Sequence, residues 1–288
     1  MTGGVDGLLA IDKPAGMTSH DVVAACRRVL GERRVGHAGT LDPSATGVLV
    51  VGVGRATRLL RFVEDSEKEY RTDAAFGVTT TTLDAEGDVT AETDAGALTE
   101  ERVRSVLPAF VGDIDQIPPM VSAIKVGGEP LYRKARRGED IERAPRRVRV
   151  SQLELEGFTP GARARATLRI RCSRGTYVRS LVADLGEAVG TGAHVATLRR
   201  LRVGPFSEET AIPLSEISAD VLRPMDEAVA GYPRRSVDEE GARALMHGKS
   251  LAAGGIDGVY AVYGPNGLLA MAEDRGEEAR SLCVLTQG

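Results

Sequence analysis

The segment GHAGTLDPSATG, residues 36–47, surrounds one carboxylate with glycines, hydroxyl side chains and a histidine. Pro43 biases Asp42 toward an extended backbone, and Gly36 and Gly39 allow backbone angles that are closed to other residues. The turn therefore aims a short acid in one direction. Such an acid can serve as a nucleophile or a general base if another group tunes and orients it. A solvated aspartate that only forms the turn explains the same residues.

A second segment, RCSRGTYVRSLVADLG, could supply the orienting group. Arg179 falls in the first turn of a predicted helix, and its guanidinium could pair with Asp42 if that end of the helix faces the acid. A neighbouring arginine lowers an aspartate pKa by about 1–3 units and keeps the carboxylate charged at neutral pH. The alternative is a surface arginine, because most charged helix residues are solvated.

Two further side chains suit contact with a nucleobase. Tyr70 is one of six tyrosines in a chain without tryptophan. Its ring could stack on a base, worth roughly 1–3 kcal/mol, or it could belong to the core. His37 could contact a flipped-out nucleotide or simply complete the turn.

Basic residues gather in one stretch although the formal net charge of the chain is −4. Residues 133–149 carry eight basic side chains against three acidic ones. They follow a proline-rich segment without periodicity, and long irregular loops are usually functional or disordered. The stretch could contact RNA phosphates or form a solvated surface.

The composition is that of a globular chain of 288 residues, with 42% hydrophobic and 27% charged residues. The three cysteines lie far apart, no CxxC pair occurs, and the four histidines are scattered. We therefore expect reduced thiols in a cytoplasmic protein, with no metal and no cofactor. No apolar run reaches about 18 residues, so no membrane span is expected.

Apolar periodicity predicts a series of strands and helices. Strands are expected at 7–12, 48–53, 68–77, 146–158, 164–173, 194–206, 258–263, 268–273 and 281–286. Helices are expected after a Ser19 cap, at 55–62, after a Thr99 cap, at 177–190, and after a capping box of Ser236 and Glu239. The strand 48–53 is apolar throughout, which predicts burial on both faces. The order of elements indicates an α+β fold: a mixed, mostly antiparallel central sheet flanked by helices, with a small β-rich C-terminal domain.

Six segments together resemble the bacterial TruB family of tRNA pseudouridine synthases, which act on the T-loop uridine. They are GLLAIDKPAGMTSHDVV, GHAGTLDPSATGVLVVGVGRAT, KEYRTDAAFG with TTTTLDAEG, QIPPMVSAIKVGGEPLYRKARRG, RCSRGTYVRSLVADLG and GAHVATLRRLRVG. The resemblance covers most of residues 7–206. It implies a catalytic domain at 1–228 that contains an RNA-clamping thumb at 116–147, and a PUA-like domain at 229–288.

The resemblance also assigns roles to residues. Asp42 is the implied catalytic aspartate, Tyr70 the active-site tyrosine and Arg179 the arginine that pairs with the aspartate. His37 matches a histidine that lies where the target base is turned out. The implied substrate contacts are Lys13, His37, Gly39, Thr40, Lys125, Tyr132, Arg136, Tyr177 and Leu201.

The implied reaction converts uridine-55 in the tRNA T-loop to pseudouridine by breaking the N1–C1′ bond, rotating the base and rejoining it through C5. Asp42 could attack C1′, remove a C2′ proton or attack C6 of the base, and the sequence leaves these open. The rival interpretation is a non-catalytic RNA-binding or tRNA-folding module. A glycoside hydrolase would need a second, paired carboxylate. We expect a monomer that binds the T-arm stem-loop and no membrane.

Overall fold

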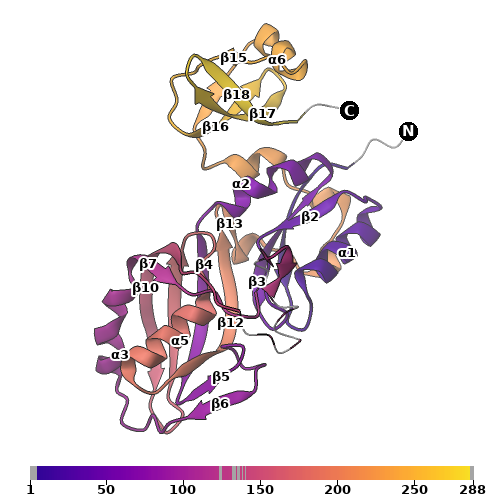
Figure 1. Ribbon diagram of the computed structural model, residues 1–288. Coiled ribbons are helices and arrows are strands. Elements are labelled where there is room, and N and C mark those ends of the chain that lie inside the picture. Colours follow the sequence, from indigo (N-terminus) through magenta and orange to yellow (C-terminus); the bar gives the residue numbers. More distant parts are fainter. Residues whose placement is uncertain are drawn as a thin grey trace. The chain divides into compact units, whose positions relative to one another are not determined.

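The computed structural model describes residues 5–122, 125–131, 134, 137, 139 and 141–285, with the backbone alone at 125, 126 and 130. They form two compact units, whose elements Figure 1 labels. The first unit comprises Met1–Pro43, Gly47–Ser66 and Val203–Gly288, and the second comprises Ser44–Thr46 and Glu67–Arg202. The chain therefore leaves the first unit after Ser66 and returns to it at Val203.

Strand β3 (Thr46–Val53) is the centre of the first unit, because β1 (Gly7–Lys13) and β2 (Val35–Ala38) both pair with it antiparallel. Val48 and Val50 belong to one apolar cluster, and Leu49 and Val51 belong to another. Successive side chains of a strand point to opposite faces, so β3 is buried on both. That prediction is confirmed. The first residues of the predicted 36–47 loop lie in β2 instead, because they pair with β3.

Helix α1 (Ser19–Leu30) is capped by Thr18 and not by the predicted Ser19. The Thr18 hydroxyl oxygen accepts from the Asp21 backbone N–H at 3.1 Å, and the Asp21 carboxylate accepts from the Thr18 N–H at 2.8 Å. The Ser19 hydroxyl is buried and is bonded elsewhere, so the exposed hydroxyl before it caps the helix. Gly31 ends the helix in the left-handed conformation with φ 64°.

The second unit contains a sheet with the strand order β12-β4-β11-β10-β7. The bounds are β4 (Lys68–Phe76), β7 (Gly112–Gln116), β10 (Arg146–Thr159), β11 (Arg165–Cys172) and β12 (Ala193–Val203). The β4–β11, β11–β10 and β10–β7 pairs are antiparallel. Helix α5 (Val178–Val189) lies across one face of this sheet (Figure 1), and its Val178, Leu181, Val182 and Leu185 are buried.

The C-terminal part of the first unit is a small sheet with the order β14-β16-β17-β18-β15 and one helix, α6 (Glu239–Met246). Its strands are β14 (Arg234–Ser236), β15 (Leu251–Ala252), β16 (Val259–Gly264), β17 (Gly267–Arg275) and β18 (Glu278–Val284). The predicted capping box of Ser236 and Glu239 is wrong. Ser236 pairs with β16 in a parallel ladder, and Asp238 caps α6 by accepting from the Gly241 N–H at 2.9 Å.

Shorter elements connect these sheets. They are η1 (Gly54–Leu59), α2 (Leu60–Glu64), β5 (Val78–Thr80), β6 (Val89–Glu92), α3 (Glu100–Val106), η2 (Leu107–Phe110), β8 (Lys125–Val126), β9 (Glu129–Pro130), β13 (Phe206–Ser207), η3 (Glu208–Thr210), η4 (Leu214–Glu216), η5 (Ala219–Val221) and η6 (Met225–Val229). Thr99 caps α3, as predicted. Sheets in which antiparallel pairs predominate, a parallel β14–β16 pair and flanking helices confirm the predicted α+β class.

We expect Thr18→Ala to lower the free energy of unfolding by about 1 kcal/mol, because the first turn of α1 loses its cap. Thr18→Ser is the matched control, since it keeps the hydroxyl oxygen, and it should unfold like the wild type. Urea denaturation measures both values. Equal stability of the alanine and serine variants would contradict the assignment of Thr18 as the cap.

Candidate active site

The residue on each side of Asp42 is fixed to the β1–α1 segment. Before it, the Leu41 N–H donates to the Ser19 hydroxyl at 2.9 Å, and that hydroxyl donates to the Leu41 carbonyl at 3.2 Å. After it, the Pro43 carbonyl accepts from the Gly16 N–H at 2.9 Å. Asp42 itself is half-buried. The backbone on both sides of the carboxylate is therefore held in place.

Lys13 adds a charged contact to the same loop. Its side chain is fully buried, and Nζ lies 2.9 Å from the Pro14 carbonyl, 2.6 Å from the Met17 carbonyl and 3.2 Å from the Pro43 carbonyl. The ammonium group is a donor only, so each of these carbonyl oxygens accepts from it. Since this group is inside the protein, the structure gives Lys13 a role in holding the Asp42 loop.

The other predicted substrate contacts of the first unit lie on the same stretch of chain. The His37 ring, on β2, packs edge-to-face against the ring of His20 with the centroids 5.4 Å apart. Gly39 has φ 75°, a left-handed conformation that favours glycine, and Thr40 is exposed. These residues lead directly into Asp42.

In the second unit, Arg179 is 5% exposed, and its guanidinium contacts Thr82, Asp84 and Val121. Its Nη1 donates to the Thr82 carbonyl at 3.0 Å and lies 3.4 Å from Oδ2 of Asp84, and its Nη2 donates to the Val121 carbonyl at 2.9 Å. Arg179 is therefore a buried, oriented guanidinium. The alternative of a solvated surface arginine is wrong.

Asp84 is a functional candidate that the sequence argument did not single out. It lies in the TTTTLDAEGD segment, is 8% exposed, and also accepts from the Glu86 N–H at 3.1 Å. Leu83 before it has φ 63°, the one positive φ among the non-glycine residues that the structure describes. Strained backbone of this kind costs about 1–3 kcal/mol and clusters at functional sites. The acid inside a turn-rich motif was the available signal.

Tyr70 lies on β4 opposite Ile170 of β11 and is 9% exposed. Tyr177 precedes α5, and its N–H donates to the Gln116 side chain at 3.0 Å, while the Gln116 amide donates back to its carbonyl at 3.3 Å. This pair joins the start of the 116–147 segment to the helix that carries Arg179. Leu201 is half-buried on β12.

The predicted catalytic residues are divided between the units, with Asp42 in the first and Tyr70 and Arg179 in the second. The pairing of Asp42 with Arg179 stays a prediction. Tyr132, Arg136 and the side chain of Lys125 lie outside the described residues.

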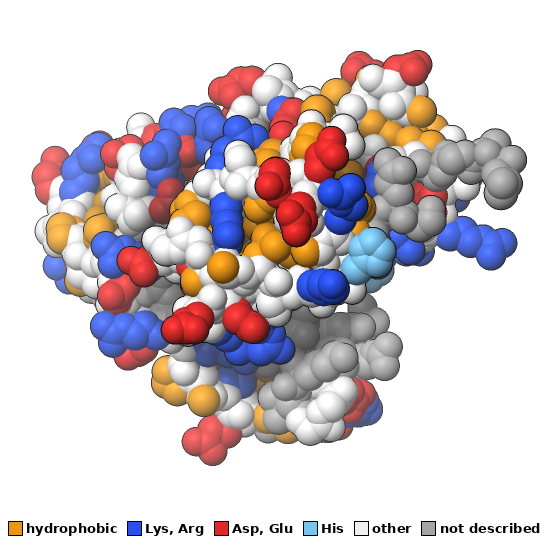
Figure 2. All heavy atoms as spheres, turned by 90° about the horizontal axis from the view of Figure 1, so that it is seen from above, with side chains coloured by type: hydrophobic (Ala, Val, Ile, Leu, Met, Phe, Trp, Pro, Cys, Tyr) orange, Lys and Arg blue, Asp and Glu red, His pale blue; other side chains and the backbone are white. Residues whose placement is uncertain are grey.

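The described end of the basic stretch is only partly compensated by acids. Arg146, Arg147 and Arg149 of β10 are exposed, and Arg147 and Arg149 lie 3.9 Å and 3.6 Å from the Asp113 carboxylate. Figure 2 shows a face of the molecule on which Lys and Arg side chains alternate with Asp and Glu. Surface ion pairs of this type contribute little to stability, so such arginines can exchange partners.

The chemistry of the thiols bears on the choice of nucleophile. Burial raises the pKa of Cys26 and of Cys172 to about 11, so both are protonated at neutral pH. Burial also raises the pKa of Cys283. Within the described ranges, no group of three His, Cys, Asp or Glu residues is arranged to hold a metal ion. No helix in the same ranges is long and apolar enough to cross a membrane.

Sequence models of one family match almost the whole chain. The model of the N-terminal domain of TruB family pseudouridylate synthases matches residues 27–178. The model of the tRNA pseudouridylate synthase B C-terminal domain matches residues 179–234. The model described as tRNA pseudouridine synthase II, C terminal, matches residues 232–286. The chain belongs to the TruB family. The predicted resemblance is confirmed, and so is the enzyme class, because a pseudouridylate synthase is an isomerase.

Individual relatives agree with this membership. The tRNA pseudouridine synthase B of Mycobacterium sp. (strain KMS) is 46% identical over 97% of this chain and 96% of its own length. The tRNA pseudouridine synthase B of Thermobifida fusca (strain YX) is also 46% identical, over 97% of this chain and 98% of its own length. Among solved structures, a chain of a Cbf5-Nop10-Gar1 complex is 29% identical, with a TM-score of 0.76 over 97% of this chain and 85% of the other. A chain of an archaeal box H/ACA sRNP Nop10-Cbf5 complex is 27% identical, with a TM-score of 0.75 over 99% of this chain and 87% of the other.

We expect Asp84→Asn to lower the free energy of unfolding by about 3 kcal/mol, because it leaves the buried Arg179 without this carboxylate. It should also slow isomerisation by this TruB enzyme. Asp88→Asn is the matched control, since Asp88 is an exposed acid of the same loop. It should stay within about 0.5 kcal/mol of the wild type. Urea denaturation decides, and equal stability of the two variants would exclude a structural role for the Asp84–Arg179 pair.

Proposed function

We propose that this enzyme isomerises uridine-55 in the T-loop of tRNA to pseudouridine, with Asp42 as the catalytic aspartate. The observation that carries the proposal is the Asp42 loop, whose flanking backbone is fixed by Ser19, Lys13 and Gly16. A carboxylate held in this way suits nucleophilic or general-base chemistry. The relatives that cover nearly the whole chain are named tRNA pseudouridine synthases, which supports tRNA as the substrate.

The reaction exchanges one bond to the sugar for another. The N1–C1′ bond breaks, the base rotates, the C5–C1′ bond forms, and the proton on C5 is lost while N1 gains one. The charged Asp42 carboxylate starts the sequence by attack on C1′, by removal of the C2′ proton, or by attack on C6. The base must first leave the stack, which costs a few kcal/mol and is easiest for loop nucleotides.

The second unit supplies groups for the same reaction under this proposal. Arg179, oriented by Asp84 and by two backbone carbonyls, keeps the Asp42 carboxylate charged. Tyr70 stacks on the detached base and takes the proton from C5. The proposed reaction also requires that water be excluded, because water would otherwise hydrolyse the intermediate.

RNA binding rests on the thumb at 116–147 and on the small domain at 229–288. Arginines of β10, at the end of the thumb, suit contact with phosphates of the T-arm, and such contacts weaken with salt. His37, Gly39, Thr40, Tyr177 and Leu201 contact the T-loop, as do Lys125, Tyr132 and Arg136. The enzyme is a cytoplasmic monomer. Residues 1–228 form its catalytic domain.

We expect Asp42→Asn to abolish turnover, with kcat lower by at least about 1,000-fold. Binding of a T-arm stem-loop should stay within about twofold, because the amide keeps the shape of the carboxylate. Release of tritium from C5-labelled uridine measures turnover, and a filter assay measures binding. Asp220→Asn is the matched control, since Asp220 is an exposed acid of the first unit.

The same pair of assays separates the enzyme from the rival binding module. A non-catalytic RNA-binding protein would bind the stem-loop and release no tritium even as the wild type. Full tritium release by Asp42→Asn would instead refute the role of this carboxylate.

A further inference from the structure

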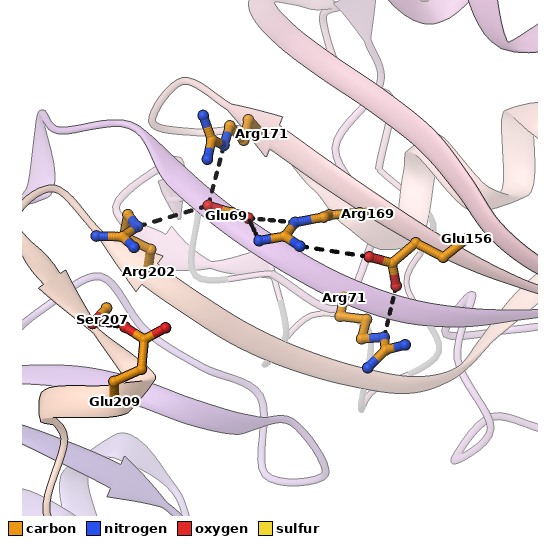
Figure 3. Close-up of polar contacts among 8 residues, drawn as sticks. All are labelled: Glu69, Arg71, Glu156, Arg169, Arg171, Arg202, Ser207 and Glu209. Carbon is orange, nitrogen blue, oxygen red and sulfur yellow. Dashed lines mark hydrogen bonds and ion pairs between the residues drawn. The ribbon is translucent and has the colours of Figure 1, made fainter.

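An ion-pair cluster lies on the face of the second-unit sheet away from Tyr70. At its centre is Glu69 of β4, whose side chain is 3% exposed. Arg169 and Arg171 of β11 and Arg202 of β12 point toward its carboxylate (Figure 3). Arg169 donates to Oε1 through Nε and Nη2, Arg171 Nε donates to Oε2 at 3.1 Å, and Arg202 Nε lies 3.7 Å from Oε2.

The surrounding guanidinium groups keep Glu69 charged. Burial raises the pKa of this carboxyl, but hydrogen bonds and charges from Arg169 and Arg171 outweigh burial and lower the pKa below its usual value. The carboxylate is therefore ionised at neutral pH and balances several positive charges at once. A buried ion pair can often be replaced by apolar side chains without loss of stability. A gain in stability thus does not explain the cluster. We infer that the cluster instead fixes the positions of the strands that carry it.

The position of the cluster is set by strand register. Glu69 lies opposite Arg171, Tyr70 opposite Ile170, and Arg71 opposite Arg169. The β4–β11 ladder runs through eight residue pairs without a shift, whereas β10–β11 contains two shifts. A slip of one residue would move every side chain of β4 to the other face. It would take the Glu69 charge away from its arginines, so the cluster opposes the slip at the residue beside Tyr70.

We propose that Glu69 is a positioning residue for Tyr70. Its buried carboxylate joins β11 and β12 to β4 directly behind the tyrosine and fixes where the ring lies. The proposal rests on the proposed function of Tyr70 as the residue that stacks on the uridine base. A displacement of about 1 Å at a reacting group can slow a reaction about 100-fold, so a small relaxation here affects the chemical step.

Glu69→Gln tests the proposal, because it keeps the shape of the side chain and removes the charge that balances three guanidinium groups. Glu156→Gln is the matched control. Glu156 lies on β10 in the same cluster, contacts Arg71 at 2.8 Å and Arg169 at 3.7 Å, and is two strands away from β4, which carries both Glu69 and Tyr70. We expect Glu69→Gln to lower kcat for tritium release at least about 10-fold with KM within about twofold. Glu156→Gln should change kcat less than about twofold.

A second readout follows the ring of Tyr70 without any reaction. The chain has six tyrosines, so ¹⁹F NMR of protein labelled with 3-fluorotyrosine gives few signals, and Tyr70→Phe assigns one of them. We expect the Tyr70 signal to shift or broaden in Glu69→Gln and to match the wild type in Glu156→Gln. If Glu69→Gln does not fold, Arg169→Gln takes its place, because the Arg169 side chain is 41% exposed and its replacement disturbs the fold less. Arg169→Gln should lower kcat and shift or broaden the Tyr70 signal in the same way.

The outcomes separate this inference from the proposed function. A wild-type kcat together with a wild-type Tyr70 signal in Glu69→Gln or in Arg169→Gln would overturn the positioning role. Equal effects of Glu69→Gln and Glu156→Gln would overturn it as well. If the wild-type enzyme released no tritium from the T-arm, the proposed function would fail, and the Tyr70 signal would still report whether Glu69 holds the ring.

Discussion

The ammonium group of Lys13 is fully buried and lies within hydrogen-bond distance of three backbone carbonyls, one of which belongs to Pro43, the residue after Asp42. A charged group inside a protein is tolerated only where polar partners surround it, because its transfer out of water is costly. The end of β1, the turn before α1 and the Asp42 loop must therefore stay together around this nitrogen. The presentation of the Asp42 carboxylate, which we propose to be catalytic, depends on that constraint.

The second unit uses the same physical principle for one cation and one anion. Arg179 is a buried cation bound by two carbonyls and the Asp84 carboxylate, and Glu69 is a buried anion bound by arginines of neighbouring strands. Arg179 is itself a residue of the proposed mechanism, and Glu69 lies next to one, Tyr70. A buried ion pair adds little net stability, but arrangements that separate its two charges are strongly disfavoured, so the pair fixes the local geometry. The family chemistry needs that geometry, since the base must be detached, turned and rejoined in place.

Much of this arrangement was predictable from sequence, and the failures have physical causes. The burial of β3 and the α5 helix follow from local pattern, whereas the catalytic roles of Asp42 and Arg179, which were inferred from motifs, stay predictions. The Ser19 cap was wrong because tertiary contact with Leu41 takes its hydroxyl, and the Ser236 cap was wrong because β14 pairs with β16. Asp84 and Glu69 gave no local signal of their partners, which are far away in the sequence.

The most direct test of this account is Lys13→Met, which keeps an apolar chain of similar length and removes the donors that hold the Asp42 loop. Single-turnover tritium release gives the rate of the chemical step, and equilibrium binding of the T-arm stem-loop gives affinity. Lys249→Met, at an exposed lysine of the same unit, is the control. The account predicts a rate at least about 10-fold lower for Lys13→Met, with affinity within about twofold of the wild type. A wild-type rate in a folded Lys13→Met protein would contradict it.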